Sequence, residues 1–494
     1  MEKEIEAETS VIKDRYRKLD EIRKKGINPY PYSFNKKNNS DEIVKKYEKL
    51  KPGESTKDNV SIAGRVMAVR RMGKLTFSHV YDEAGKIQII LKEDDSKNNY
   101  DLFKLFDIGD IIGVEGNVLK TKTGETTVEV KKLQLLCKSL YPLPEKYHGI
   151  QDQELKYRRR YLDLMMNPEK KKVFATRAKI ISTIREFLDS RGFFEVETPV
   201  LQTIYGGANA KPFRTHHNAL NFDMYLRISP ELHLKRLIVG GFDKVYEICK
   251  NFRNEGMDKT HNPEFTELEF YWAYTDYKDM MKIFEELWAF VAKKVLGTTE
   301  IEYQGAKIDL KPPWKRLPMI DALKEYAKID VSKMSDDELK DLANTYSLQI
   351  AGDLTRGTVI AALFEKLVED KLMAPVFIID HPKETSPLTK VHRSNPALIE
   401  RFEPYINGWE VGNAYSELND PVEQRKRLNE QEKLLRAGFE EAQPMDEDFV
   451  RAIEYGMPPC GGVGIGLDRM IMLFTNSPTI RDVIFFPTMK PENK

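Results

Sequence analysis

The stretch from Phe252 to Tyr271, FRNEGMDKTHNPEFTELEFY, decides the fold and holds much of the candidate chemistry. Its first half contains Gly256, Asn262 and Pro263, which are typical of loops. Its second half alternates with a period of two, so it predicts a strand whose odd-numbered residues share one face. Two glutamates on that face require either a cation beside them or a solvated strand edge, and both interpretations stay open. The candidate side chains here are Arg253, Glu255, His261, Asn262, Phe265, Glu269 and Tyr271.

FRNEG followed by HNPEFT resembles motif 2 of the class II aminoacyl-tRNA synthetases, in the form found in the lysyl-tRNA synthetase family of subclass IIb. Together with GIGLDR near the C-terminus, in the same order and at a similar distance, the pattern is highly specific. The resemblance extends over nearly all 494 residues. It implies an α+β fold, with a seven-stranded antiparallel sheet flanked by helices and an N-terminal OB-type β-barrel.

Composition limits the classes of function. A chain of 494 residues is too long for one core, so we expect two or more domains. Lys plus Arg and Asp plus Glu both number 78, so any RNA contact must come from local basic patches. A charged N-terminus and the lack of a long apolar stretch predict neither signal peptide nor membrane anchor. Three scattered cysteines (Cys137, Cys249 and Cys460) suit a reducing cytosol, so we expect a cytoplasmic protein.

The residue pattern of the N-terminal third changes twice, from a helical periodicity to short alternating segments and then to a basic run. Residues 1–26 predict a basic amphipathic helix, either packed against the protein or in contact with RNA. Short alternating segments separated by glycines then predict a small barrel of the OB type. We expect the helix and an extension at 1–57, the barrel at 58–140 and a connector at 141–170. The basic run LKYRRRYLDL in the connector is either solvated surface or a contact with the RNA backbone.

Four side chains of the predicted barrel can stack on or hydrogen-bond to unstacked bases: Arg65, Phe77, His79 and Gln88. The strand pattern alone favours Phe77 in the barrel core. The resemblance to an anticodon-binding barrel favours Phe77 on a surface that contacts the tRNA anticodon instead.

Residues 171–494 are expected to form the catalytic domain. A helix at 173–191, closed by a glycine and followed by FFEVETPVL as a strand, resembles motif 1, which forms the homodimer interface in class II enzymes. In IYGGANAKPF, Gly207 allows the backbone to approach a ligand closely. The segment 302–372 predicts a mixed insertion whose role the sequence does not reveal.

The C-terminal region adds more candidates. ERFEPYINGWEVGNAYSELND predicts two strands that carry Glu403, Glu410, Asn413 and Glu417. GGVGIGLDRMIMLF predicts a Gly-rich turn into a helix that carries Arg469. A Gly-rich turn alone is weak evidence for a phosphate site, and no P-loop lysine follows it.

Activation of an amino acid by ATP needs positioning and charge neutralisation rather than covalent help. Arg253 and Arg469 suit phosphate oxygens, because a guanidinium group is planar and offers several donors. Glu403 and Glu410 are hard oxygen ligands that suit Mg²⁺ shared with ATP, or they are ordinary surface charges.

The resemblance implies a role for each motif residue. Arg253 and Arg469 are the expected catalytic residues, and Glu403 and Glu410 the expected Mg²⁺ ligands. The expected ATP-binding residues are Arg253, Glu255, His261, Asn262, Phe265, Glu403, Glu410 and Arg469. The expected lysine-binding residues are Gly207, Glu231, Glu269, Tyr271, Asn413 and Glu417.

The implied activity is that of a lysine–tRNA ligase, which forms lysyl-adenylate and pyrophosphate from lysine and ATP and transfers lysine to the 3′ end of tRNA(Lys). So many carboxylates at one pocket demand a cationic ligand, whereas an aspartate pocket would need a buried cation. Three alternatives stay open: an aspartyl or asparaginyl enzyme, a relative that modifies a protein lysine or makes a small amide, and a nucleic-acid-binding barrel with a degenerate catalytic domain.

Overall fold

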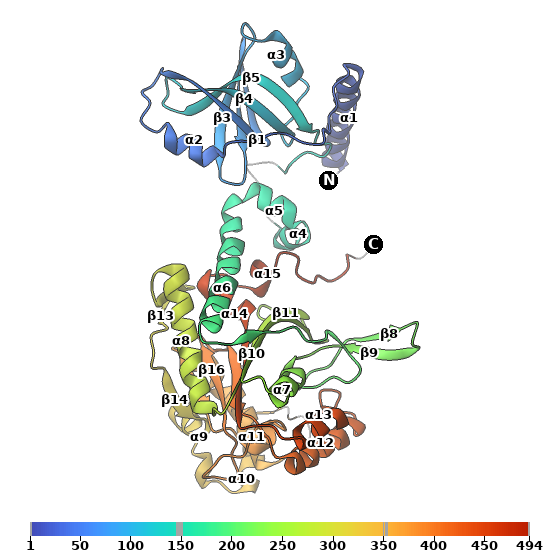
Figure 1. The fold of residues 1–494 in the computed structure, drawn as a ribbon, viewed down its shortest axis with the longest axis vertical. Coiled ribbons are helices and arrows are strands. Elements are labelled where there is room, and N and C mark those ends of the chain that lie inside the picture. The colour runs from blue at the N-terminus through green and yellow to red at the C-terminus, as the bar shows by residue number, and fades with distance from the viewer. Residues whose placement is uncertain (1, 145–151, 349, 351–353, 493–494) are drawn as a thin grey trace. The chain divides into compact units, whose positions relative to one another are not determined.

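The computed structural model describes residues 2–144, 152–348, 350 and 354–492. It divides into two compact units (Figure 1), one of residues 1–153 and 161–168 and one of residues 154–160 and 169–494. The predicted connector is therefore shared between the two units. No helix in the described part of the chain combines the length and the apolar character needed to cross a membrane.

A closed barrel forms the centre of the first unit, which confirms the predicted β-barrel. Its strands are β1 (Ser55–Met72), β2 (Leu75–Tyr81), β3 (Lys86–Lys92), β4 (Ile111–Lys120) and β5 (Thr126–Cys137). They pair in the order β1-β2-β3-β5-β4, and only β3 and β5 run parallel among these five. The helices of this unit are α1 (Glu2–Lys24), α2 (Ser40–Lys46), α3 (Lys97–Phe103) and α5 (Arg160–Met166).

Strand β2 shows which side chains face out of the barrel. Thr76, Ser78 and Val80 are buried, whereas Phe77 and His79 between them are only half-buried. Alternate residues of a strand point to opposite faces, so Phe77 lies on the outer face. The prediction of Phe77 as barrel core, made from the strand pattern alone, is wrong.

Helix α1 confirms the prediction for residues 1–26, with one exception. Leu19 and Ile22 are buried, as the amphipathic pattern predicts. Arg15, which the pattern assigns to the basic solvated side, is also buried, and its guanidinium group donates to the carbonyl oxygens of Ile108 and Tyr141, both at 2.9 Å. Periodicity does not reveal such a contact, because a long side chain beside the apolar stripe can reach carbonyl groups of another segment.

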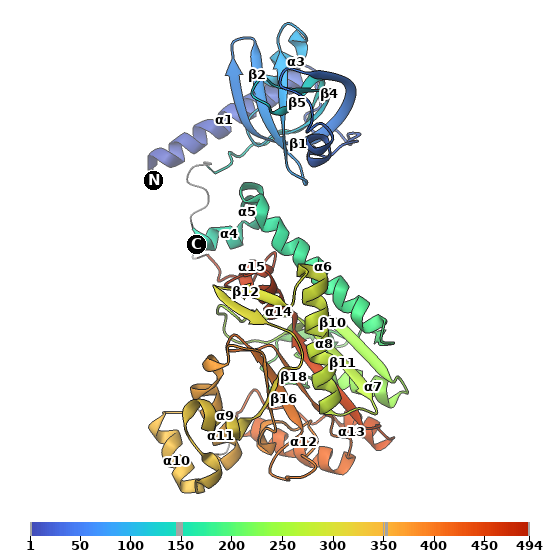
Figure 2. The same cartoon turned by 90° about the vertical axis from the view of Figure 1, so that its left-hand side faces the viewer.

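A nine-stranded sheet forms the centre of the second unit within the described residues (Figure 2). Its strands are β6 (Phe194–Glu195), β10 (Lys244–Phe252), β11 (Glu264–Ala273), β14 (Lys315–Pro318), β15 (Val376–Ile379), β16 (Arg401–Ile406), β17 (Trp409–Glu410), β18 (Gly412–Ser416) and β19 (Cys460–Gly466). The order is β14-β15-β16-β18-β19-β11-β10-β6, with β17 paired to β16. The edge pairs β14–β15 and β10–β6 are parallel. The sheet thus exceeds the seven antiparallel strands expected, in part because the segment 302–372 adds β14 at one edge.

Helices cover both faces of this sheet. The helices α6 (Lys171–Asp189), α8 (Tyr277–Leu296) and α14 (Leu467–Phe474) share one core, to which β11 contributes Leu268 and Phe270. The helices α7 (Glu231–Val239), α12 (Pro421–Arg436) and α13 (Glu447–Glu454) pack on the other side, where β11 contributes Tyr271. This division confirms the alternation predicted for the second half of FRNEGMDKTHNPEFTELEFY. The remaining strands and α-helices are β7 (Leu201–Gln202), β8 (Arg214–His217), β9 (Phe222–Leu226), β12 (Glu300–Tyr303), β13 (Ala306–Asp309), α4 (Gln153–Arg158), α9 (Met319–Ala322), α10 (Asp336–Thr345), α11 (Arg356–Leu367) and α15 (Ile480–Val483).

Three local predictions differ from the structure. FFEVETPVL forms only the short strands β6 and β7, because Pro199 between them lacks an amide donor for a ladder. The two strands expected around Glu410 are three, because a tight turn at Gly408 folds β17 back onto β16. The Gly-rich segment before Arg469 is a strand, β19, rather than a turn. Glycine is depleted in strands, so the glycine content of this segment led to the wrong prediction. The contacts around the cavity explain why β19 contains glycines.

Candidate active site

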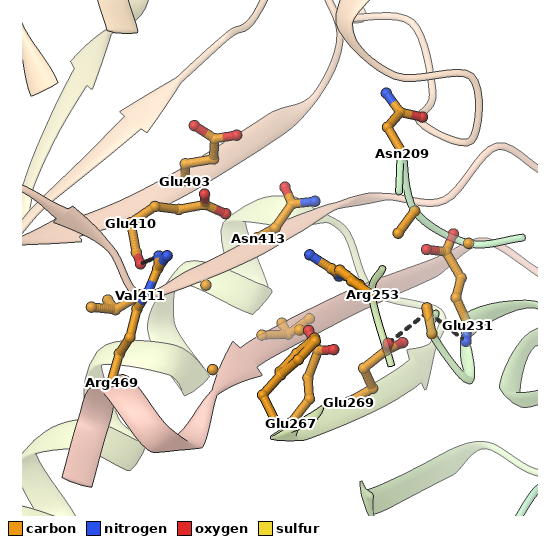
Figure 3. A pocket seen from close by; sticks show the side chains of 18 of the residues that line it. Asn209, Glu231, Arg253, Glu267, Glu269, Glu403, Glu410, Val411, Asn413 and Arg469 are labelled. Carbon is orange, nitrogen blue, oxygen red and sulfur yellow. Dashed lines mark hydrogen bonds between the residues drawn. The ribbon is translucent and has the colours of Figure 1, made fainter. Parts of the chain in front are cut away.

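A cavity of about 390 Å³ opens in the second unit, lined by β11, β16–β19 and the loop after β10. Figure 3 shows the carboxylates of Glu231, Glu267, Glu269, Glu403 and Glu410 around it. Of the predicted ATP- and lysine-binding residues, all but Glu417 line this cavity. The fold therefore brings together residues that lie more than 250 positions apart in the sequence, from Gly207 to Arg469.

Arg253 lies between the acidic groups. Its amide donates to the carbonyl oxygen of Pro263 (2.9 Å), which closes the loop onto the start of β11. Its guanidinium carbon lies 5.0 Å from the centre of the Phe265 ring, a cation–π contact. Its Nε is buried and has no hydrogen-bond partner within the described residues. A buried donor without a partner suits an anionic ligand in the cavity.

One part of the cavity, which we call the Glu231–Glu269 end, also contains Ser229 and Tyr271. The Ser229 hydroxyl donates to Glu269 Oε1 (2.7 Å) and the Tyr271 hydroxyl donates to Glu269 Oε2 (3.0 Å). Burial, with the negative charges of Glu267 and Glu231, raises the pKa of Glu269 well above its usual range. These carboxylates repel one another in a desolvated site, so the end suits a cationic ligand.

Glu417 lies one layer behind this wall. Its carboxylate contacts the ammonium group of Lys235, which also contacts Glu231, and both glutamates and Lys235 are buried. Glu417 Oε1 has no hydrogen-bond partner in the described part of the chain. Burial raises the pKa of Glu417 to about 8, an effect that Lys235 opposes and Glu231 reinforces. Sequence reasoning missed Lys235, although its spacing of four residues from Glu231 on a helix was an available signal.

The glycines of β19 make room for these groups. A Cβ on Gly462 would lie 2.1 Å from Glu417 Oε1 and 2.5 Å from the Tyr271 ring. A Cβ on Gly464 would lie 3.0 Å from Glu267 Oε1. Gly462 lines the cavity, so the missing side chain also leaves Glu417 Oε1 close to the cavity surface. Close approach, rather than a turn, accounts for glycine here.

The other acidic part, the Glu403–Glu410 end, is built on β16 and β17. Tyr405 donates to Glu403 Oε2 (2.9 Å), and Arg401 pairs with Glu403 while its Nε donates to Asn413 Oδ1 (2.9 Å). Burial and the charge of Glu403 raise the pKa of Glu410 to about 7. Burial also acts on Glu403, but the charges of Arg401 and His381 and the hydrogen bonds from Tyr405 and Arg401 together outweigh it and lower the pKa of that group.

This pair of carboxylates fits Mg²⁺. No group of three or more His, Cys, Asp or Glu side chains able to hold a metal occurs among the described residues. The carboxylates of Glu403 and Glu410 repel each other when both are ionised, and a hard cation between them would relieve this repulsion. A bound phosphate and water would supply the other oxygen ligands of the ion. The donor set therefore fits a metal that arrives with a nucleotide.

Arg469 lies in the first turn of α14, the helix that follows β19. One guanidinium nitrogen lies 2.9 Å from His261 Nε2, and another donates to the backbone oxygen of Glu410. His261 Nδ1 in turn lies 2.8 Å from Asp258 Oδ2. The side chains of FRNEG–HNPEFT and GIGLDR thus meet directly.

Asp468, next to Arg469, was missed by sequence reasoning. It is buried, pairs with Arg177 on α6 and accepts a hydrogen bond from the Thr266 amide on β11 (2.7 Å). Arg177 also donates to Thr266 Oγ1 (2.8 Å). These bonds join α6, β11 and α14, the elements that carry the three motifs. In the sequence, the only signal for them was the position of Asp468 beside Arg469.

In the first unit, three of the four predicted base-contacting residues share a face. His79 pairs with Gln88 across β2 and β3, and both side chains meet Glu125, at 2.8 Å from His79 Nε2 and 2.7 Å from Gln88 Nε2. Phe77 lies on the same outer face of β2. Arg65 pairs with Tyr81 at the end of that ladder and donates to the carbonyl oxygen of Gly109 (2.7 Å).

Known proteins match this arrangement. Residues 152–490 match the family described as tRNA synthetases class II (D, K and N), and residues 60–136 match the OB-fold nucleic acid binding domain. The chain therefore belongs to the class II tRNA synthetases of this family. The predicted fold, a class II α+β domain with an N-terminal OB-type barrel, is confirmed.

Close relatives fall in one branch of that family. A lysine–tRNA ligase of Thermoanaerobacter sp. (strain X514) is 54% identical over 486 residues, which is 98% of this chain and 96% of the relative. A lysine–tRNA ligase of Clostridium novyi (strain NT) is 52% identical over 498 residues, 99% of this chain and 97% of the relative. The predicted resemblance to lysyl-tRNA synthetases is confirmed.

Proposed function

We propose that this protein is a lysine–tRNA ligase, which activates lysine with ATP and transfers it to tRNA(Lys). The observation that carries the proposal is one cavity in which Glu231 and Glu269, with Glu417 behind them, lie near Arg253, whose buried Nε has no partner in the described residues. Free lysine has two ammonium groups and one carboxylate, so it complements both features. Relatives named lysine–tRNA ligase, over nearly full length, support the choice within the family.

The amino-acid ligand is assigned to the Glu231–Glu269 end. Glu231 and the backbone at Gly207 receive the α-ammonium group, and Asn413 lies toward the carboxylate. Glu269, Tyr271 and Glu417 receive the ε-ammonium group. Charge-assisted hydrogen bonds of this kind are about twice as strong as neutral ones, which favours a cationic side chain over a neutral analogue.

Adenylate formation needs no general base, because the lysine carboxylate is already ionised. A carboxylate oxygen attacks the α-phosphorus of ATP, the bond to the bridging oxygen breaks, and pyrophosphate leaves with that electron pair. Arg253 neutralises charge on the α-phosphate and orients the carboxylate. Phe265 and Arg469 hold the two faces of the adenine, while Glu255, His261 and Asn262 contact the rest of the nucleotide.

Glu403 and Glu410 would hold Mg²⁺ together with phosphate oxygens of ATP. When bound, the ion supplies positive charge to the phosphates. Transfer then follows when a hydroxyl of the terminal tRNA ribose attacks the lysyl carbonyl carbon and AMP leaves.

The barrel is assigned to the tRNA anticodon. Phe77 offers a ring for base stacking, and His79, Gln88 and Arg65 offer hydrogen bonds, in keeping with how such barrels bind single strands. We assign residues 58–140 to this domain, 1–57 to the N-terminal extension, 141–170 to the connector and 171–494 to the catalytic domain.

We also infer a homodimer through motif 1 and a cytoplasmic location. Phe194 and Phe242 are exposed, with ring centres 5.5 Å apart, and Leu201 beyond them is exposed as well. Exposed apolar groups next to an edge strand favour association with a second copy. Free cysteines at positions 137, 249 and 460 favour a reducing compartment.

The experiment that tests the function is ATP–pyrophosphate exchange with each standard amino acid, followed by charging of tRNA(Lys). Lysine is expected to support exchange far better than any other amino acid. Faster exchange with aspartate or asparagine would contradict the proposal, since an acidic pocket has no electrostatic reason to prefer an acidic substrate.

A further inference from the structure

Lys235 is a charged residue with no exposed surface, one helical turn after Glu231 on α7. Its ammonium group contacts the carboxylates of Glu231 and Glu417 and lies 5.5 Å from the centre of the Tyr415 ring. A charge enclosed this completely is tolerated only when it is paired. The two contacts explain how Lys235 is accommodated, and its position beside the cavity indicates what it does.

The two partners of Lys235 lie at different depths. Glu231 lines the cavity, and its Oε2 accepts a hydrogen bond from the Tyr415 hydroxyl (2.6 Å). Glu417 lies behind the wall, with Oε1 free of hydrogen-bond partners in the described residues and facing the space beside Gly462. Lys235 does not line the cavity, so it joins the two carboxylates from behind.

The charges at this end can be counted. Glu231, Glu269 and Glu417 bring three carboxylates, and Lys235 brings one ammonium group. Lys235 balances one of these carboxylates, and burial raises the pKa of Glu269 and of Glu417, so an ammonium group of the substrate would stabilise their ionised forms. Glu267 also lines the cavity, and burial raises its pKa, an effect that the charge of Arg253 opposes.

We propose that Lys235 is a positioning residue of the amino-acid pocket, which ties Glu231 to Glu417 and sets the number of negative charges left for the substrate. Lys235 acts through these two carboxylates and does not touch the substrate. The inference rests on the proposed function, because it takes lysine as the amino acid that is activated.

The test compares variants of the full-length chain in ATP–pyrophosphate exchange. Lys235→Met keeps the length of the side chain but removes the charge that holds Glu231 and Glu417 together, so we expect the KM for lysine to rise by about 10- to 100-fold as these two carboxylates lose their positions. The KM for ATP is expected to stay within about twofold, because the nucleotide groups lie at the other end. An unchanged KM for lysine would overturn the proposal.

Two further variants separate positioning from simple support of the fold. In Lys235→Met combined with Glu417→Gln, the KM for lysine is expected to rise no more than in the worse of the two single variants, because Lys235 acts through Glu417 and the two effects should not add. Lys235→Arg keeps the charge and is expected to raise the KM for lysine less than Lys235→Met. If Lys235→Met does not fold, Lys235→Arg and the double variant decide. A KM for ATP that rises as much as the KM for lysine in both variants would overturn the proposal.

Lys138 provides a matched control. It also has no exposed surface, and its ammonium group lies 2.7 Å from Asp107 Oδ2 and 3.0 Å from Asp110 Oδ2 in the barrel unit. Lys138→Met is expected to lower the Tm and to leave both KM values unchanged. If the wild-type protein activates an amino acid other than lysine, the proposed function fails. If the wild-type protein activates lysine and the Lys235→Met variant has the same KM for lysine, only the role of Lys235 is overturned and the proposed function stands.

Discussion

Two ends of one cavity are rich in glutamate, yet they differ in what balances the charge. At the Glu231–Glu269 end the balancing cation is the enclosed ammonium group of Lys235. At the Glu403–Glu410 end it is the guanidinium group of Arg401, while Arg469 binds the backbone of Glu410. A compact ammonium can join two carboxylates at one point, whereas a guanidinium fork extends over several acceptors. We therefore propose that the same acidic side chain binds an organic cation at one end and a metal ion that carries phosphate at the other.

The largest effect is expected from a substitution of Arg253, which lies between the two ends of the cavity. Arg253→Ala removes the charge that faces the anionic parts of both substrates, so kcat/KM for exchange should fall by two to three powers of ten, about 3–4 kcal/mol. Arg425→Ala on α12 serves as the control, because Arg425 pairs with Glu447 and Glu454 away from the cavity. If the Arg253→Ala variant exchanged at nearly the wild-type rate, the assignment of Arg253 to the α-phosphate and the lysine carboxylate would be wrong.

The two ends should separate in their substrates. Glu417→Gln keeps the shape of the side chain but removes its charge, so the KM for lysine is expected to rise about 30-fold, or about 2 kcal/mol, by loss of a charged hydrogen bond. The KM for ATP should hold. An equal rise in both constants would mean that Glu417 only supports the fold.

Dependence on pH should also distinguish the ends. Glu417 has a pKa of about 8, so below that pH its carboxyl group is protonated and must lose the proton before an ammonium group binds. The KM for lysine is therefore expected to fall as pH rises, by at most about tenfold per unit, and to level off above about 8. The groups around Glu417 are Lys235, Glu231, Tyr271, Tyr415 and Cys460. Glu417→Gln should flatten the profile, and a steep profile in that variant would assign the titration to another group.

A smaller effect is expected from a substitution beside the proposed Mg²⁺ site. Tyr405→Phe removes the hydroxyl that donates to Glu403 Oε2 and leaves the carboxylate in place. Outer hydrogen bonds of this type orient metal ligands, so half-maximal exchange is expected to need up to about tenfold more Mg²⁺. The KM for lysine at saturating Mg²⁺ is the control, and a change there alone would argue against a metal at this end.

The smallest effect on amino-acid activation is expected from the barrel. Phe77→Ala should leave lysine-dependent exchange unchanged and weaken charging of tRNA(Lys) by about 1–3 kcal/mol, the worth of one base stack. Parallel loss of both reactions would show instead that Phe77 supports the protein as a whole.

Sequence patterns predicted most of the wall of the cavity but, apart from Glu417, not the residues behind it. The alternation after Pro263 predicted β11 and the shared face of Glu269 and Tyr271, because period two is a local property. Lys235 and Asp468 escaped because their roles depend on contacts with residues far along the chain. Composition failed at β19, since a run of glycines indicates a turn unless one knows that neighbouring side chains fill the space.

The glycine strand β19 has a consequence for resistance to inhibitors. A compound that packs against Gly462 touches backbone where any added side chain would collide with Glu417 or Tyr271, and a side chain at Gly464 would press on Glu267. A mutation that blocks such a compound there would also displace the groups assigned to the substrate. Escape is therefore expected to arise at other parts of the cavity wall, so compounds anchored on β19 should retain potency longest under selection.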